Sequence, residues 1–190
     1  FRLKKTIISM QFEKYFNDYN RSIYDLLNNL DTKLIERSIL LINQCKNKDG
    51  KVIIVGNGGS SSIASHVSVD LIKTANIKSL TFNNSNLITC FANDYGHDHW
   101  VAEAIKAYTS KNDIVILISS SGTSNNIINA AKYCKEMNIP FITLSGFSKN
   151  NPLSQLGNVN IYIDSNSYNF IEMTHHIILV SIVDIFAKKL

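Results

Sequence analysis

Two segments rich in Gly and Ser, each directly after a strand-like apolar run, constrain the fold of this chain more than any other feature. Residues 56–62 follow the apolar run 51–55, and residues 119–126 follow the apolar run 113–118. A strand that ends in small residues before a helix presents backbone N–H groups, hydroxyl donors and the positive end of the helix dipole. Such a turn binds phosphate without a lysine or a metal, so the two segments predict a small phosphorylated ligand.

Each segment also has a simpler explanation. The glycines of 56–59 could only reverse the chain, and 119–124 could be a serine-rich surface loop. The first segment has neither the G-x-G-x-x-G pattern of dinucleotide-binding folds nor the G-K-[ST] ending of a P-loop. We favour phosphate binding because serines open the helix after the first segment and an apolar strand leads into the second.

From residue 51 onward, apolar strands alternate with helices. We expect strands at about 51–55, 78–82, 113–118, 140–145 and 159–163. The intervening and final helices are expected at about 60–74, 84–90, 97–109, 123–137 and 168–189. Two more helices, separated by a break at 29–32, precede them. The pattern predicts an α/β fold, a three-layer α/β/α sandwich around a five-stranded parallel sheet, whose ligands bind at the carboxyl ends of the strands.

The composition limits the classes of partner. The chain has 190 residues and a net charge of +4, which suit one domain over 10–190, with 1–9 as an extension or a cloning remnant. Lys and Arg are scattered and no apolar stretch reaches the length of a membrane span, so we expect neither nucleic acid nor membrane as a partner. The odd set Cys45, Cys90 and Cys134, without a C-x-x-C pair, indicates reduced thiols and a cytoplasmic protein.

Titratable side chains suggest a reactive site on two of the helices. His66 and Asp70 are four residues apart on the helix after the first turn, which suits a metal pair, an acid–base pair or a solvated polar face. Glu172, His175 and His176 interrupt the apolar final helix. Polar groups on a helix otherwise suited to burial need partners, which favours a site.

The segments 56–60 with His66, 92–96 and 119–124 together resemble the sugar isomerase (SIS) domain superfamily. Within it, the chain is most similar to the sedoheptulose-7-phosphate isomerase (phosphoheptose isomerase) family, from about residue 10 to the C-terminus. The resemblance implies an aldose–ketose isomerase that forms D-glycero-D-manno-heptose 7-phosphate, a precursor of lipopolysaccharide or capsule heptose. It also implies a cytoplasmic homotetramer with active sites between subunits, and a possible zinc ion.

The resemblance assigns residues to these roles. The phosphate would lie against Ser119, Ser120, Ser121 and Ser124. The sugar would contact Asn57, Gly58, Gly59, Ser60, Asn93, Asp94 and Glu172. Asp70 would take the position of the catalytic base. Our own hypothesis, beyond the resemblance, is that His66, Asp70, Glu172 and His176 form a shifted metal or acid–base cluster in which Asp70 is the base and His176 the acid.

Three positions depart from the family pattern. Asp70 stands where the family has the catalytic Glu, Glu172 where it has a Gln, and Val180 where it has a second catalytic His. His176, one turn before Val180, points broadly the same way and could replace the missing group. Two alternatives stay open: a non-catalytic SIS protein that binds a sugar phosphate for a regulatory role, as the DnaA-binding relatives do, and an isomerase of a different sugar phosphate.

Overall fold

The computed structural model describes residues 2–188, with side chains from Met10 onward. The chain divides after Leu30 into two compact units. The first consists of helix α1 (Arg2–Asn28), which includes most of the predicted extension 1–9; Phe1 lies outside the described residues. The second carries the elements that alternate along the sequence, and it is described next by itself.

The second unit contains a five-stranded parallel sheet in the order β2-β1-β3-β4-β5. Its strands are β1 (Val52–Gly56), β2 (Ser79–Thr81), β3 (Ile114–Ile118), β4 (Phe141–Ser145) and β5 (Val159–Tyr162). Every residue of β1, β3 and β4 is buried, as expected for apolar runs covered on both faces of a sheet. The predicted sheet is confirmed, and all five predicted strands are present within two residues of the expected bounds.

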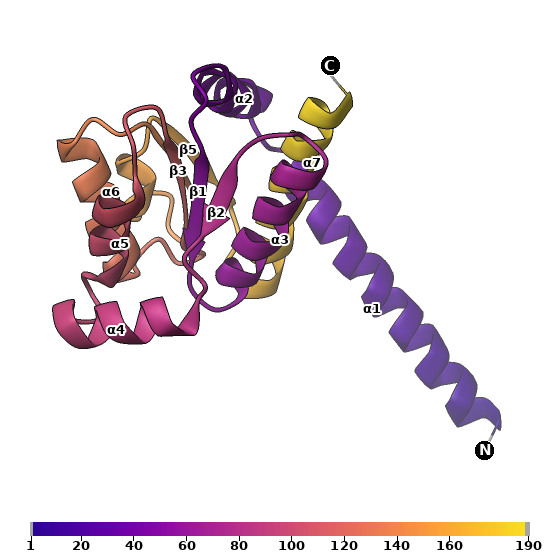
Figure 1. Cartoon of the computed structure of the whole chain (residues 1–190). Coiled ribbons are helices and arrows are strands. Elements are labelled where there is room, and N and C mark those ends of the chain that lie inside the picture. Colours follow the sequence, from indigo (N-terminus) through magenta and orange to yellow (C-terminus); the bar gives the residue numbers. More distant parts are fainter. Residues whose placement is uncertain (1, 189–190) are drawn as a thin grey trace. The chain divides into compact units, whose positions relative to one another are not determined.

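Helices cover both faces of this sheet and make the predicted three-layer sandwich (Figure 1). Its helices are α2 (Thr32–Asn47), α3 (Gly59–Lys73), α4 (Ser85–Tyr95), α5 (Trp100–Tyr108), α6 (Asn125–Glu136) and α7 (Tyr168–Lys188), with a short 3₁₀ turn η1 (Leu153–Gln155). Helices α5 and α6 lie on one side of the sheet, where Trp100, Ile105 and Ala130 share a buried core with Val115 and Leu117. Helices α3 and α7 pack together on the other side.

The break at 29–32 is confirmed, and two predicted helix boundaries are wrong: the start of α5, which is at Trp100 and not near residue 97, and the end of α4. Asp31 caps α2, since its carboxylate accepts a hydrogen bond from the Lys33 N–H at 3.0 Å. Helix α4 does not end near residue 90 but runs to Tyr95, so Asn93 and Asp94 belong to its last turn and not to a loop. It ends at Gly96, whose φ of 83° is accessible mainly to glycine.

Helix α7 is long and apolar enough to cross a membrane, judged by length and composition alone. This differs from the expectation that no stretch reaches that length. The helix nevertheless buries Ile171, His175, Ile178 and Ile182, which recur every three or four residues along one face. A helix packed in the core of the sandwich has this pattern too. Length and composition are therefore weak evidence that α7 spans a membrane.

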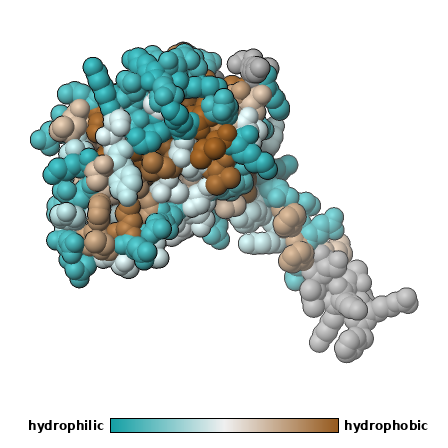
Figure 2. Space-filling model, in the orientation of Figure 1, coloured by the Kyte–Doolittle hydropathy of each residue, from teal (hydrophilic) through white to brown (hydrophobic). Residues whose placement is uncertain are grey.

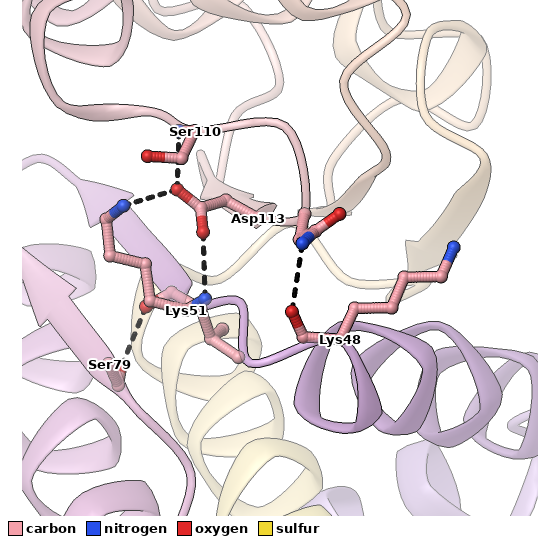
Figure 3. Close-up of polar contacts among 7 residues, drawn as sticks. Lys48, Lys51, Ser79, Ser110 and Asp113 are labelled. Carbon is pink, nitrogen blue, oxygen red and sulfur yellow. Dashed lines mark hydrogen bonds and ion pairs between the residues drawn. The ribbon is translucent and has the colours of Figure 1, made fainter.

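A buried carboxylate fixes the amino ends of the two central strands (Figure 3). Asp113, just before β3, forms an ion pair with Lys51, just before β1. Its oxygens also accept hydrogen bonds from the N–H of Lys51 at 2.9 Å and of Ser110 at 2.7 Å. These contacts hold the amino ends of β1 and β3 side by side, at the end of the sheet opposite the two turns.

Candidate functional site

The two Gly/Ser turns come together in one pocket, as the sequence predicts. Strands β1 and β3 are paired with Gly56 opposite Ile118, so the segments after them are neighbours at the carboxyl edge of the sheet. Between them lies a pocket of about 250 Å³. Its lining residues are Asn57, Gly58, Gly59, Ser60, Ile118, Ser119, Ser120, Ser121, Ser124, Tyr168 and Glu172.

A reciprocal amide pair joins the two turns. The Asn57 side-chain amide donates to Asn126 Oδ1 and the Asn126 amide donates to Asn57 Oδ1, both at 2.9 Å. Asn126, at the start of α6, is buried. Both side chains use an oxygen and a nitrogen in this pair, so Asn57 holds the turns together as well as lining the pocket. The sequence analysis included Asn126 in the segment 119–126 but assigned it no role in the site.

The second turn is compact and its hydroxyls are partly committed to one another. Ser119 Oγ donates to Ser124 Oγ at 3.0 Å, and Ser121 Oγ accepts from the Thr123 N–H at 3.3 Å. Gly122 has a φ of 67°, and a Cβ there would lie 1.9 Å from Oδ1 of the buried Asn151. Only glycine fits at this point. The turn leads into α6, so the positive end of that helix lies at the pocket as expected.

The first turn is in contact with Glu172 of α7. A Cβ on Gly59 would lie 2.2 Å from Glu172 Oε2, so the missing side chain leaves room for the carboxylate. Glu172 Oε1 also accepts a hydrogen bond from Ser120 Oγ at 3.5 Å. The carboxylate thus lies at the first residue of α3, where an anion is favoured by the helix dipole. Among the described residues that line the pocket, none is cationic.

His66, Asp70 and His176 form a hydrogen-bonded chain between α3 and α7. His66 Nδ1 lies 2.7 Å from His176 Nε2, and His66 Nε2 lies 3.0 Å from Asp70 Oδ2. Burial and the neighbouring His66 lower the pKa of His176, and Asp70 opposes this shift. Asp70 thus favours the protonated ring that an acid requires, whereas burial and His66 oppose it.

This chain extends away from the pocket of the same molecule. His176 is one helical turn beyond Glu172, or about 6 Å along α7. Asp70 is eleven residues beyond Gly59, or about 16 Å along α3. None of the three lines the pocket. The structure therefore brings together His66, Asp70 and His176, and separately Glu172 with the serines.

The four predicted metal ligands do not converge on one point. Both ring nitrogens of His66 are used in contacts with His176 and Asp70, whereas Glu172 lies against Gly59. Among the residues whose side chains the structure describes, no group of three or more His, Cys, Asp or Glu side chains is arranged to hold a metal. This arrangement does not fit a zinc ion, and zinc binding stays a prediction.

Asn93 and Asp94 lie on α4, outside the set of pocket-lining residues. The Asn93 amide donates to Asp94 Oδ1 at 2.9 Å, and the Cys90 thiol lies 3.7 Å from Asp94 Oδ2. Asp98, four residues later, accepts hydrogen bonds from the side chains of Asn125 and Asn129 of α6. The segment is thus anchored next to the second turn, but the sugar contacts of Asn93 and Asp94 remain predictions.

His175 has a structural role, unlike its neighbour. It is fully buried, and its Nε2 lies 3.2 Å from the carbonyl oxygen of Ser145 at the end of β4. Burial lowers the pKa of His175 to about 4, so the ring is neutral at pH 7 and Nε2–H donates to the carbonyl. Its Nδ1 has no hydrogen-bond partner among the described residues.

Comparison with known proteins identifies the family. A model of the SIS domain matches residues 14–146. The phosphoheptose isomerase of Sulfurimonas denitrificans is 31% identical over 192 residues, which cover 98% of this chain and 96% of that protein. The phosphoheptose isomerase of Helicobacter pylori is 31% identical over 158 residues, which cover 79% and 82%. The structure of phosphoheptose isomerase GmhA from Neisseria gonorrhoeae superposes with a TM-score of 0.83 at 24% identity, covering 94% of this chain and 99% of that one, and shows the same fold. The chain therefore belongs to the phosphoheptose isomerase family of SIS-domain proteins.

Proposed function

We propose that this protein is an aldose–ketose isomerase that converts sedoheptulose 7-phosphate into D-glycero-D-manno-heptose 7-phosphate. The single observation that carries the proposal is the pocket in which both Gly/Ser turns meet at the carboxyl edge of the sheet. Relatives about 30% identical over most of the chain are named phosphoheptose isomerase. The product would supply heptose for lipopolysaccharide or capsule in the cytoplasm.

The pocket supports a model in which one part of the site binds the phosphate and another part catalyses proton transfer at C1 and C2. Backbone N–H groups and hydroxyls of the second turn would bind the phosphate, with the positive end of α6 behind them. An isomerase must then move one proton from C1 to C2 and one from O1 to O2. A base removes the proton from C1 of the ketose and an acid protonates the C2 oxygen to give the enediol. Removal of the proton from the O1 hydroxyl and return of a proton to C2 then give the aldose.

Asp70 and His176 are proposed as the base and the acid of this reaction. Their hydrogen-bonded link through His66 supports the assignment, since it lets the charge of Asp70 stabilise the imidazolium that forms when His176 holds a proton. The distance of Asp70 from the pocket argues against direct attack within one molecule. No step is assigned to zinc. Metal analysis of the purified protein tests the predicted ion, with one zinc per chain supporting it.

A homotetramer with active sites between subunits is proposed as the working form. Side chains next to the histidine chain support it, because Val69 and Ile72 of α3 and Met173 and Ile177 of α7 are 40–58% exposed. Figure 2 shows a hydrophobic area over α3 on the visible face. A second copy covering this face would bury the apolar side chains and place another pocket near Asp70. Light scattering coupled to gel filtration measures the mass, and a monomer at working concentration would contradict this part.

One observation favours a second candidate function. Asp70 and His176 do not line the pocket, so this structure also suits a protein that binds a sugar phosphate without converting it. Such a binding or regulatory role, or the isomerisation of another sugar phosphate, remains the alternative.

Proton NMR in D₂O separates these functions. The protein is incubated with sedoheptulose 7-phosphate, with and without Zn²⁺. Aldose product, or deuterium at C1 or C2, supports the isomerase. If the sugar phosphate raises the melting temperature of the protein but no deuterium enters the sugar, the protein binds this ligand without converting it. If neither response occurs, both roles are excluded for this sugar. The variant His176→Ala should abolish exchange, and unchanged turnover would contradict its assignment as the acid.

A further inference from the structure

An aromatic side chain that the proposed function does not use forms part of the pocket wall. Tyr168, the first residue of α7, lines the pocket and is 57% exposed. Its ring packs against Phe147, with ring centroids 4.7 Å apart and an angle of 59° between the planes. Tyr168 is four residues before Glu172, so the two side chains share one face of the helix. The sequence analysis did not single it out.

The loop after β4 is built to hold this aromatic pair. Phe147 has a φ of 57°, a left-handed conformation that bulky residues rarely adopt and that persists only where the surroundings enforce it. The Phe147 N–H donates to the Ser165 carbonyl at 2.9 Å, and the Tyr162 hydroxyl donates to the Phe147 carbonyl at 2.9 Å. Gly146 lies so close to α7 that a Cβ would be 2.5 Å from the Ile171 side chain. An unfavourable backbone conformation is thus maintained where it supports the ring of Tyr168.

The two sides of the pocket therefore offer different chemistry. The serine turn offers hydroxyl and N–H donors, which suit a phosphate. Tyr168 offers an aromatic face, and Glu172 offers carboxylate oxygens that accept hydrogen bonds. A carbohydrate matches that second combination, because one side of it presents C–H groups and its hydroxyls are donors.

We infer that Tyr168 contacts the carbohydrate part of the phosphorylated ligand and is a specificity-determining residue, with Phe147 as its positioning residue. The inference rests on the proposed function for the identity of the sugar. It requires only that the phosphate binds at the serine turn and that the carbon chain extends along α7. The aromatic contact then adds affinity for the sugar phosphate but none for phosphate alone.

Calorimetric binding of two probes, sedoheptulose 7-phosphate and inorganic phosphate, tests this inference. Tyr168→Ala should weaken binding of the sugar phosphate about tenfold and leave phosphate binding within about twofold. Tyr168→Phe should bind both like the wild type, since the contact uses the ring face. Phe147→Ala should weaken sugar-phosphate binding in the same direction.

Tyr108→Ala is the matched control. Tyr108 is 48% exposed and its ring packs 5.5 Å from that of Phe82, but it does not line the pocket. This variant should bind both probes normally. The inference is overturned if Tyr168→Ala weakens both probes equally or neither, or if the wild type binds the sugar phosphate no more tightly than phosphate. Tight binding lost in Tyr168→Ala, without turnover by the wild type, would leave the inference standing and overturn the isomerase proposal.

Discussion

Glu172 is the residue that most affects which ligands this pocket accepts. Its carboxylate lies at the start of α3, against Gly59 and within hydrogen-bond reach of Ser120. Its negative charge offsets part of the positive potential at the start of α3 that would otherwise favour a bound phosphate. The family pattern has an uncharged Gln at this position. The charge therefore disfavours a phosphate both near the start of α3 and near Ser120.

Replacing Glu172 by Gln should tighten the binding of inorganic phosphate by about five- to tenfold, because a negative charge close to the bound anion is removed. The side chains have similar size, so the pocket keeps its shape. Isothermal titration calorimetry at constant ionic strength measures the change. Glu136→Gln, at the exposed end of α6, is the control and should have no effect. Unchanged affinity in Glu172→Gln would show that the carboxylate does not face the anion.

The adjacent residue His175 should make folding stability depend on pH. Its pKa is about 4 in the folded protein and about 6.5 when unfolded, so the unfolded chain binds the additional proton between these values. Stability should thus be constant above pH 6.5 and fall by about 3 kcal/mol down to pH 4 from this group. Urea unfolding at several pH values measures the fall. The fall in unfolding free energy should be about 3 kcal/mol smaller in His175→Gln than in the wild type. A variant of the exposed His97 should show the same fall as the wild type. An equal fall in His175→Gln and the wild type would contradict the assignment.

At the scale of elements, the pocket depends on how the chain leaves each strand. The second turn shows this best, since Gly122 combines a positive φ with close packing against Asn151. Asn151 is itself held by donating to Ser145 Oγ and to the carbonyls of Gly146 and Ser148. It therefore connects the loop after β4 to the turn after β3, and has little freedom to move away.

Gly122→Ala should accordingly destabilise the protein more than Gly96→Ala does. Both glycines have positive φ, but a Cβ at Gly96 would meet open space. The strain at Gly96 should cost about 1–3 kcal/mol. The clash with Asn151 should add about 1–3 kcal/mol at Gly122. Urea unfolding compares the two variants, and equal losses would mean that Asn151 moves aside easily.

At the scale of the whole molecule, the two edges of the sheet have different tasks. The carboxyl edge carries the pocket, and the amino edge carries the Asp113 network that holds β1 and β3 in place (Figure 3). A change at the amino edge should therefore affect stability without affecting the chemistry of the pocket.

Asp113→Ala tests this separation. Removing a buried carboxylate that accepts two backbone hydrogen bonds and pairs with Lys51 should lower the free energy of unfolding by about 3 kcal/mol. Phosphate affinity of the folded protein should stay the same. The matched control is Asp49→Asn, which removes the charge from the exposed 2.7 Å ion pair with Lys78, keeps a residue suited to the positive φ of 59° at this position, and should cost less than about 1 kcal/mol. Similar losses in both variants would contradict the structural role of Asp113.

The sequence predicted the fold well because β1 and β3 are uninterrupted apolar runs, and because the break at Asp31 has clear capping chemistry. The pocket was predictable since parallel neighbouring strands bring their following turns together. Contacts between distant segments were not predictable. Asn126 pairs with Asn57 and Tyr168 packs against Phe147, and no local pattern encodes such pairs. His66 and His176 were expected in one cluster, and they do meet, but without Glu172. The end of α4 was predicted too early: residues 91–95 contain no helix-breaking residue, so the helix continues to Tyr95 and ends at Gly96.

The absence of a cation among the described pocket residues has a kinetic consequence. Lysines and arginines attract an anion over several ångströms and raise its association rate, an effect that salt suppresses. Hydroxyls and backbone N–H groups act only at short range. The lining residues should therefore add no attraction that raises the association rate of a phosphorylated ligand, and they should select among ligands through residence time once the ligand is inside.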